Sequence, residues 1–259
     1  MSVRSTMLLA LVLASACKGE STGDPTYQAP LAAIDAVDDS LAKIVEDSGQ
    51  PRLRVPVAAD DPTKGAGEPL VVVVEFSDFQ CPHCGRAAEA FDELVAAYPQ
   101  DVRLVFKQFP LPMHPDAELG SRATYAALAQ GKFWAMHDLL FANRTRMKRD
   151  DVVAHAKSLG LDVAKFEAAL DDPATAARVQ ADKRLGLSLG VRGTPSFFVN
   201  GRSFSGALPP AQLGEIVEAE RKLGQALVDA GSKRTEVYAR IAGTAPELPA
   251  LDPPTPEAP

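Results

Sequence analysis

The spacing of apolar residues predicts a strand, a helix and a second strand in the first half of the chain. Residues 70–76 read Leu-Val-Val-Val-Val-Glu-Phe, a short apolar run typical of a buried strand. Residues 86–98 carry apolar side chains at helical spacing, at Phe91, Leu94 and Val95. Residues 101–109 alternate between apolar and polar positions. These three segments therefore predict a β-α-β unit.

The second half begins with a long block of helices. Between residues 115 and 190 glycine and proline divide the chain into five predicted helices, at residues 116–130, 131–142, 149–159, 163–171 and 174–189. Two short apolar runs follow at 196–200 and 202–205, and the Asn-Gly pair between them is a hairpin signal. Further helices are predicted at 210–223 and 226–241. This order predicts an α/β fold with an inserted all-helical subdomain.

The first 16 residues have the pattern of a secretory signal peptide. Arg4 supplies a positive charge, residues 7–13 are a short apolar run, and Ala14, Ser15 and Ala16 are the small residues of a cleavage site. The apolar run is too short to span a bilayer as a helix of the mature protein. We therefore expect the protein to be exported.

Cys17 follows directly, and residues 13–17, Leu-Ala-Ser-Ala-Cys, resemble the bacterial lipobox. Ala14 stands where that pattern usually has Leu, Val or Ile. The resemblance implies that Cys17 is the lipidated N-terminus and that the protein is held by this lipid on the periplasmic side of the cell envelope. The alternative is an ordinary secretory signal followed by a cysteine without this role.

The remaining segments complete the expected organisation. Residues 17–50 are predicted to be a tether with an amphipathic helix at 31–47, and residues 51–69 are predicted to contain at most one short strand, near residues 53–57. The main domain is expected over residues 51–225, with the helical insertion at about 115–190. A C-terminal helix at 226–242 precedes a proline-rich tail over 243–259, which we expect to be disordered.

Composition and charge narrow the class of protein. The 259 residues are 46% hydrophobic, which is enough for a substantial core, and the net charge is −7. Residues 1–16 contain one charged residue, Arg4, so the chain without them has 26 basic and 34 acidic residues and a net charge of −8. There is no basic run or stripe, so the sequence gives no indication of a nucleic-acid partner.

The candidate chemistry lies where the first strand meets its helix, at Cys81-Pro82-His83-Cys84. Unpaired backbone N–H groups and the helix dipole at this end favour a negative group, and the thiolate is the reactive form of cysteine. Cys81 lies nearer the helix start, so we expect it to be the more exposed nucleophile and Cys84 the resolving thiol. His83 could stabilise the thiolate by its charge or ring N–H, and Pro82 suits the first helical turn.

Three roles of the cysteine pair can be compared. Cysteines three apart on a helix can form a disulfide, but so small a ring constrains the unfolded chain very little, so a stabilising bond is a poor explanation. A structural zinc site needs four ligands, and the four histidines show no matching spacing. A redox-active Cys81–Cys84 pair, without metal or organic cofactor, is the favoured interpretation.

Several motifs together resemble the DsbA-like branch of the thioredoxin superfamily. They are Phe-Ser-Asp-Phe-Gln-Cys-Pro-His-Cys at 76–84, Gly-Thr-Pro at 193–195 and Lys-Phe-Trp-Ala-Met-His at 132–137. The resemblance covers roughly residues 55–223. It implies a thioredoxin fold with a helical insertion and thiol–disulfide exchange as the activity.

The resemblance also assigns roles to residues outside the cysteine motif. Thr194-Pro195 would form a cis peptide bond facing the cysteines, and the Thr194 backbone would pair with an extended substrate segment. Glu75 would be a buried acid that assists proton transfer to the resolving thiol, because burial raises the pKa of a carboxyl. The alternative for Glu75 is a strand-end side chain that points to water. His114 could line the substrate groove or cap its loop.

The function expected from these features is transfer of the Cys81–Cys84 disulfide to extended, reduced protein substrates. A stabilised thiolate favours the reduced pair, which makes the disulfide form a strong oxidant. A membrane redox partner would then have to regenerate the disulfide. The alternatives are a reductase or isomerase on the same fold, and a non-catalytic lipoprotein that binds peptides or copper.

Overall fold

The computed structural model describes residues 52–243. The predicted signal peptide, the lipid-attachment residue Cys17, the helix at 31–47 and the tail beyond Gly243 lie outside the described residues. Among the described residues, no helix is both long enough and apolar enough to cross a membrane.

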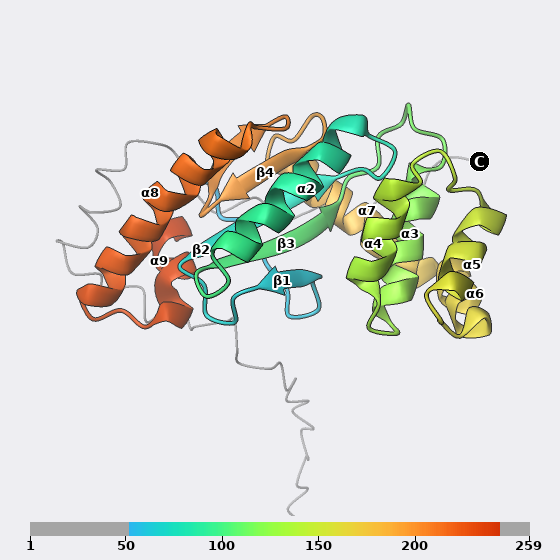
Figure 1. The fold of residues 1–259 in the computed structure, drawn as a ribbon, viewed down its shortest axis with the longest axis horizontal. Helices are drawn as coiled ribbons and strands as arrows, with labels where there is room; N and C mark the ends of the chain where they lie inside the picture. Colours follow the sequence, from blue (N-terminus) through green and yellow to red (C-terminus); the bar gives the residue numbers. More distant parts are fainter. Residues whose placement is uncertain (1–51, 244–259) are drawn as a thin grey trace, which may run out of the picture.

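A mixed five-stranded sheet runs through the centre of the described chain (Figure 1), with strand order β1-β3-β2-β4-β5. The two central strands, β2 and β3, are parallel, and the other neighbouring pairs are antiparallel. The strands are β1 Thr63–Gly65, β2 Val71–Ser77, β3 Val102–Gln108, β4 Ser196–Val199 and β5 Arg202–Ser205.

Helices fill the connections between the strands. One helix links the parallel strands, five follow β3 before the chain returns to β4, and the rest follow β5. They are α2 Pro82–Ala97, α3 Ala117–Leu128, α4 Phe133–Ala142, α5 Arg149–Ser158, α6 Val163–Asp171, α7 Pro173–Ser188, α8 Pro210–Asp229, the 3-10 helix Arg234–Glu236 and α9 Val237–Ala242.

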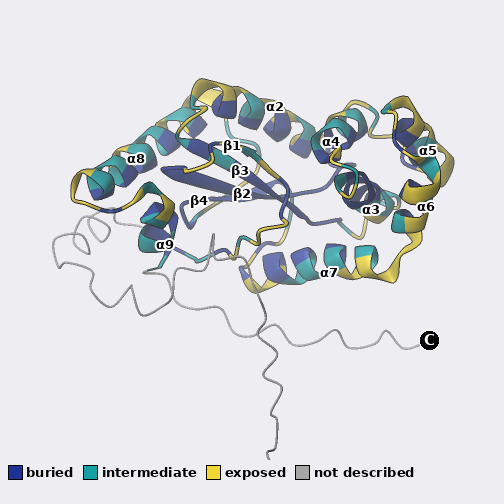
Figure 2. Cartoon of the chain, turned by 90° about the horizontal axis from the view of Figure 1, so that it is seen from below, coloured by how far each residue is buried: buried dark blue, intermediate teal, exposed yellow. Residues whose placement is uncertain are grey.

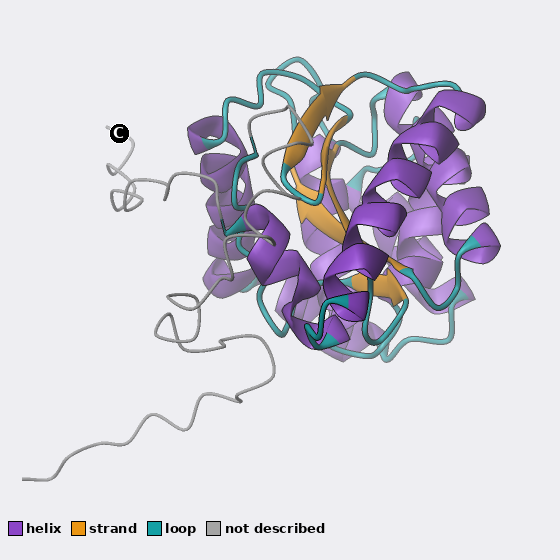
Figure 3. Cartoon of the chain, turned by 90° about the vertical axis from the view of Figure 1, so that its left-hand side faces the viewer, coloured by secondary structure: helices purple, strands orange, loops and turns teal. Residues whose placement is uncertain are grey.

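The sheet is covered on both faces, as the views from below and from the side show (Figures 2 and 3). All seven residues of β2 are buried, so this strand has no polar face toward water. Val71 and Val73 pack with α2 and α8 on one face, and Val72 and Val74 pack with α7 on the other. Because side chains alternate along a strand, the odd-numbered residues of β2 face the α2 helix.

Helices α3–α6, together with Val179 of α7, enclose a second hydrophobic core beside the sheet (Figure 1). Phe79 and Phe106 contribute to this core from the sheet side, and the ring centroid of Phe106 lies 5.4 Å from that of Phe133. The described chain is therefore an α/β thioredoxin fold with inserted helices, which confirms the predicted fold class.

Two predicted elements differ in the structure. The single short strand allowed between residues 51 and 69 is β1, at Thr63–Gly65, and not at residues 53–57. Buried Val55 packs in the core on the α7 side of the sheet, and its carbonyl accepts a hydrogen bond from the Tyr238 hydroxyl at 2.7 Å. The helices predicted at 210–223 and 226–241 are a single helix α8 to Asp229, then a break and the short α9. Gly224 lies inside α8, and a Cβ there would come within 2.9 Å of the Leu70 carbonyl oxygen. This glycine therefore permits close packing and does not end the helix.

Candidate active site around Cys81 and Cys84

The cysteine motif lies at the end of the central strand. β2 ends at Ser77, a short turn follows, and Cys81 is the N-cap residue of α2. Pro82 is the first helical residue, where its missing N–H leaves no hydrogen bond unmade. Cys84 lies one turn into α2 on the side that faces the sheet and is fully buried, whereas Cys81 is 5% exposed.

The two thiols form no disulfide in this structure. Their pKa values are shifted in opposite directions. The pKa of Cys81 is lowered to about 5, chiefly by a hydrogen bond from the Cys84 thiol, with further contributions from the Thr194 side chain and from the backbone N–H groups of Cys84 and His83. Burial raises the pKa of Cys84 far above its ordinary range, and the neighbouring Cys81 and Glu75 add to this effect. At neutral pH the pair therefore consists of a thiolate at Cys81 and a thiol at Cys84.

The Thr194–Pro195 peptide bond is cis and lies against the cysteine pair. When protonated, the Cys81 thiol donates to the Thr194 carbonyl oxygen across 3.4 Å. Thr194 and Cys81 are 113 residues apart in the chain, and the pairing of β4 with β2 brings them together.

Glu75 of β2 lies near Cys84, since its charge acts on that thiol. Its side chain is fully buried, so the alternative of a strand-end carboxylate in water does not hold. Burial raises its pKa to about 8; the nearby Ser77 side chain opposes this shift, and the charge of Asp92 adds to it. Neither carboxyl oxygen has a hydrogen-bond partner among the described residues. A carboxyl that keeps its proton at neutral pH is suited to carry a proton.

The ring of His83 is placed differently from the sequence-based expectation. It is exposed, and its Nδ1 lies 2.6 Å from Nη2 of Arg86. A guanidinium group only donates hydrogen bonds, so Nδ1 acts as the acceptor in this contact and the ring is turned to Arg86. The contribution of His83 to the Cys81 thiolate is its backbone N–H.

Sequence reasoning missed Asp78, which joins the cysteine turn to a second loop. Its buried carboxylate accepts hydrogen bonds from the backbone N–H of Gln80 and of Leu111, both at 2.7 Å, and pairs with Nδ1 of His114 at 2.8 Å. Its own N–H donates to Sγ of Cys84 at 3.5 Å. His114 therefore holds its loop against the turn that leads to the cysteines. The available signal was an aspartate at a strand end, a common turn residue.

Sequence reasoning also missed Ser77, the last residue of β2. It lies two positions after Glu75, so both side chains point to the same face of the sheet. Ser77 is fully buried, and its hydroxyl lowers the pKa of both Glu75 and Cys84. The available signal was the i, i+2 spacing of two polar residues in an apolar strand.

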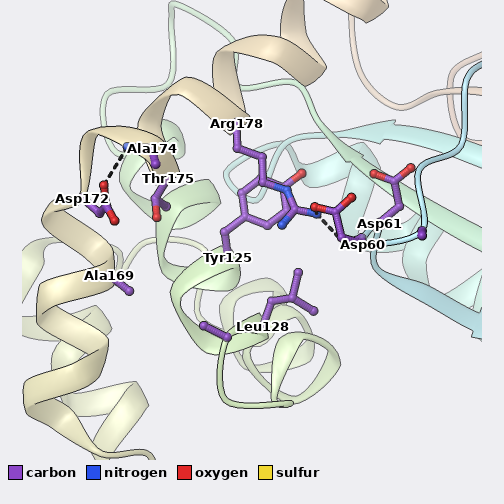
Figure 4. Close-up of a pocket in the computed structure, with 11 residues that line it drawn as sticks. Asp60, Asp61, Tyr125, Leu128, Ala169, Asp172, Ala174, Thr175 and Arg178 are labelled. Atoms are coloured by element: carbon purple, nitrogen blue, oxygen red, sulfur yellow. Dashed lines mark hydrogen bonds and ion pairs between the residues drawn. The ribbon is translucent and has the colours of Figure 1, made fainter. Parts of the chain in front are cut away.

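A hollow on the helical side of the molecule lies apart from the cysteines (Figure 4). Its lining comes from α3, from the region of α6 and α7 and from the turn at residues 59–61, and includes none of the residues around the dithiol. Arg178 stacks over Tyr125 at 4.3 Å and pairs with Asp60 at 3.1 Å, so its charge is already matched. Residues 52–243 also contain no cluster of three or more His, Cys, Asp or Glu side chains that could hold a metal.

A family comparison agrees with this geometry. Residues 72–218 match the family model described as the DSBA-like thioredoxin domain, which is more than half of the chain. The chain belongs to the DSBA-like thioredoxin family. The matched region includes the cysteine motif, the helical insertion and Thr194–Pro195, so this DsbA-like chain contains the redox motif and the cis-proline loop within one recognised domain.

Curated relatives share only a part of their length with this DsbA-like chain. A Na(+)/H(+) antiporter NhaA 3 of Salinispora tropica is 42% identical over 156 residues, which are 60% of this chain and 24% of the antiporter. A Na(+)/H(+) antiporter NhaA of Herminiimonas arsenicoxydans is 35% identical over 162 residues, 62% of this chain and 26% of that protein. The chain thus spans about a quarter of the length of these relatives.

Solved structures show the same fold over nearly their full length. A thioredoxin-like oxidoreductase from Silicibacter pomeroyi is 33% identical with a TM-score of 0.59, and the match covers 64% of this chain and 94% of that one. A periplasmic thioredoxin-like protein from Salmonella enterica is 20% identical with a TM-score of 0.57 and covers 72% and 98%. The second comparison shows the fold alone.

Proposed function

We propose that this protein is an exported thiol–disulfide oxidoreductase that transfers its Cys81–Cys84 disulfide to reduced proteins in the cell envelope. The observation that carries the proposal is the division of acidity between the two thiols, with the pKa of Cys81 at about 5 and that of Cys84 strongly raised. A thiolate that is stable in the reduced protein is a good leaving group, so the oxidised pair readily gives up its disulfide.

The size of this effect supports the proposed direction of electron flow. At pH 7 a thiol pKa of about 5 stabilises the reduced form by about 2.3 kcal/mol more than a pKa of 7, at which half of the thiol is already ionised. For a two-electron couple this raises the reduction potential by roughly 50 mV, which favours oxidation of substrates over their reduction.

A groove near the cis-proline loop supports the proposal that the substrate is a protein. Its walls are α2, through residues such as Glu89 and Ala90, and the loop at residues 207–210. This loop is fixed to the cis-proline, because Gly206 N–H donates to the Pro195 carbonyl oxygen at 2.8 Å. An extended segment whose cysteine meets Cys81 would continue along this groove beside Thr194, which is the strand-addition mode of peptide binding.

The proposed location in the cell envelope rests on the N-terminal sequence. The signal-like residues 1–16 and the lipobox-like cysteine at 17 support export and lipid attachment. One protein with the same fold is described as periplasmic, which is consistent with an envelope location. A membrane redox partner would reoxidise the dithiol after each cycle.

The test is the reduction potential of the Cys81/Cys84 pair, measured by equilibration with glutathione buffers. We expect a value on the oxidising side of roughly −210 mV, since the reference scale runs from roughly −270 mV for a reductase to roughly −120 mV for a strong oxidase. A value near −270 mV would reverse the proposed direction and favour a reductase.

Two further measurements separate the rival functions. Oxidative refolding of a reduced, disulfide-containing protein should be accelerated by the oxidised protein and not by its Cys81→Ser variant. Rearrangement of a scrambled substrate by the reduced protein, without net oxidation, would favour an isomerase. If Cys81→Ser retains every measured property of the parent protein, the chain is a binding protein and the enzymatic proposal is wrong.

A further inference from the structure

Three buried polar atoms of β2 that have no hydrogen-bond partner lie on the side of the sheet that faces the resolving cysteine, Cys84. They are both carboxyl oxygens of Glu75 and the hydroxyl oxygen of Ser77. Both residues are 0% exposed. Buried polar atoms are nearly always paired, so unpaired ones clustered beside a reactive group point to a role in the reaction.

The fold aligns these groups with the sulfur. Glu75 and Ser77 share the α2-facing side of β2, and fully buried Cys84 occupies the sheet-facing side of α2. Ser77 stands two residues nearer the motif than Glu75. Its hydroxyl influences both groups, since the Ser77 side chain lowers the pKa of Glu75 and that of Cys84.

The other neighbours of Glu75 offer no competing route for a proton. In the sheet, Glu75 is paired with Phe106 of β3 and Phe197 of β4, both buried and apolar. From α2, the ionisable groups that act on Glu75 or are acted on by it are Cys84 and Asp92, and Asp92 is engaged with Lys64 at 2.6 Å.

We propose that the Ser77 hydroxyl is the proton-carrying link between the Glu75 carboxyl and the Cys84 sulfur. A hydroxyl both donates and accepts, so it can receive one proton as it passes on another. This inference rests on the proposed function and adds a residue to its chemistry.

The step balances as follows. A substrate thiolate attacks Sγ of Cys81, the new sulfur–sulfur bond forms, and the Cys81–Cys84 bond breaks with its electron pair left on Cys84. Ser77 gives its proton to the Cys84 thiolate and takes the carboxyl proton of Glu75, which becomes a carboxylate. The second substrate thiolate then attacks the substrate sulfur, Cys81 leaves as a thiolate, and Glu75 regains a proton from solvent. The substrate dithiol has lost two electrons, which the cysteine pair has gained.

The experiment is single-turnover reduction of the oxidised protein by a reduced dicysteine peptide, followed by acid quench and mass spectrometry, in H₂O and D₂O between pH 5 and 10. For Ser77→Ala we expect the rate at pH 7 to fall at least about tenfold, since positioned proton transfer contributes at least about a hundredfold and part of it persists without the link. The parent rate should fall above pH 8 as Glu75 loses its proton. Ser77→Ala should lose this pH dependence and the solvent isotope effect.

Matched variants keep the result specific. Ser77→Thr retains the hydroxyl and should restore the isotope effect. Ser121→Ala removes another buried, unpartnered hydroxyl on α3 and should match the parent protein. Circular dichroism checks the fold, and Ser77→Gly is the second hydroxyl-free variant if Ser77→Ala does not fold.

The outcomes distinguish this inference from the proposed function. If Ser77→Ala keeps the parent rate, pH profile and isotope effect while Glu75→Gln is slow, Glu75 acts without Ser77 and the inference is wrong, although the oxidoreductase stands. If Ser77→Ala and Ser121→Ala are slowed equally, with unchanged isotope effects, Ser77 is only structural and the inference also fails. Exchange that persists in Cys81→Ser would remove the proposed function itself.

Discussion

Replacement of Glu75 by glutamine should remove a loss of stability that grows with pH. Glu75 is fully buried, and its pKa rises from 4.5 to about 8 on folding. Below pH 4.5 the carboxyl is protonated in both states and has no pH-dependent effect. As pH rises through 4.5, the unfolded chain ionises while the folded chain cannot, so the folded state loses stability until pH passes about 8.

The magnitude follows from the two pKa values at about 1.36 kcal/mol for each pH unit. Relative to pH 5, the parent protein should lose about 2.5 kcal/mol by pH 7 and about 4 kcal/mol by pH 9 through Glu75 alone. Glutamine has no proton to lose, so its own burial shifts the stability of Glu75→Gln by an amount that is the same at every pH.

The assay is urea unfolding of both proteins, kept reduced with a phosphine, at pH 5, 7 and 9. The difference between the two free energies of unfolding should widen by these amounts, because all other titrating groups are common to both proteins. Two stability curves that run parallel from pH 5 to pH 9 would show that Glu75 ionises normally, and the argument for a buried proton carrier would fail.

Two further predictions concern the cysteine environment and the packing of α8. Thr194→Val removes a hydroxyl that lowers the pKa of Cys81. The midpoint of thiolate absorbance near 240 nm should therefore rise from about 5 by up to about one pH unit, the worth of one hydrogen bond; an unchanged midpoint would contradict the role of the hydroxyl. Glu220→Ala leaves Arg52 without its 2.9 Å ion pair, in which both side chains are 2% exposed, and should cost about 3–5 kcal/mol in urea unfolding. Glu218→Ala, which breaks a half-exposed pair with Arg221 in the same helix, should cost less than about 1 kcal/mol, and equal losses would refute the burial argument.

Much of the architecture could be predicted because it depends on local pattern. Residues that are neighbours in the sequence are enough to predict strand β2, the helices of the insertion and the Asn200-Gly201 hairpin. The turn residues Asn200 and Gly201 have the positive φ values that this hairpin turn requires, 45° and 87°. Prediction was wrong where contacts between distant segments decide. Gly224 serves close packing against Leu70 within α8 and does not mark a helix end, and the short strand lies at Thr63–Gly65, whereas Val55 enters the core without forming a strand.

The sequence by itself determined the chemical groups of the candidate site, since the Cys-Pro-His-Cys spacing at a strand–helix junction places two thiols on one turn of a helix. Only the tertiary structure decided their acidity. Thr194 reaches Cys81 from 113 residues away, and burial between β2 and α2 keeps the proton on Glu75. The tertiary structure also places the His83 ring against Arg86 and brings Ser77 and Asp78 into the site. The physical reason is that periodicity is local, whereas desolvation and hydrogen bonding depend on groups that only folding brings together.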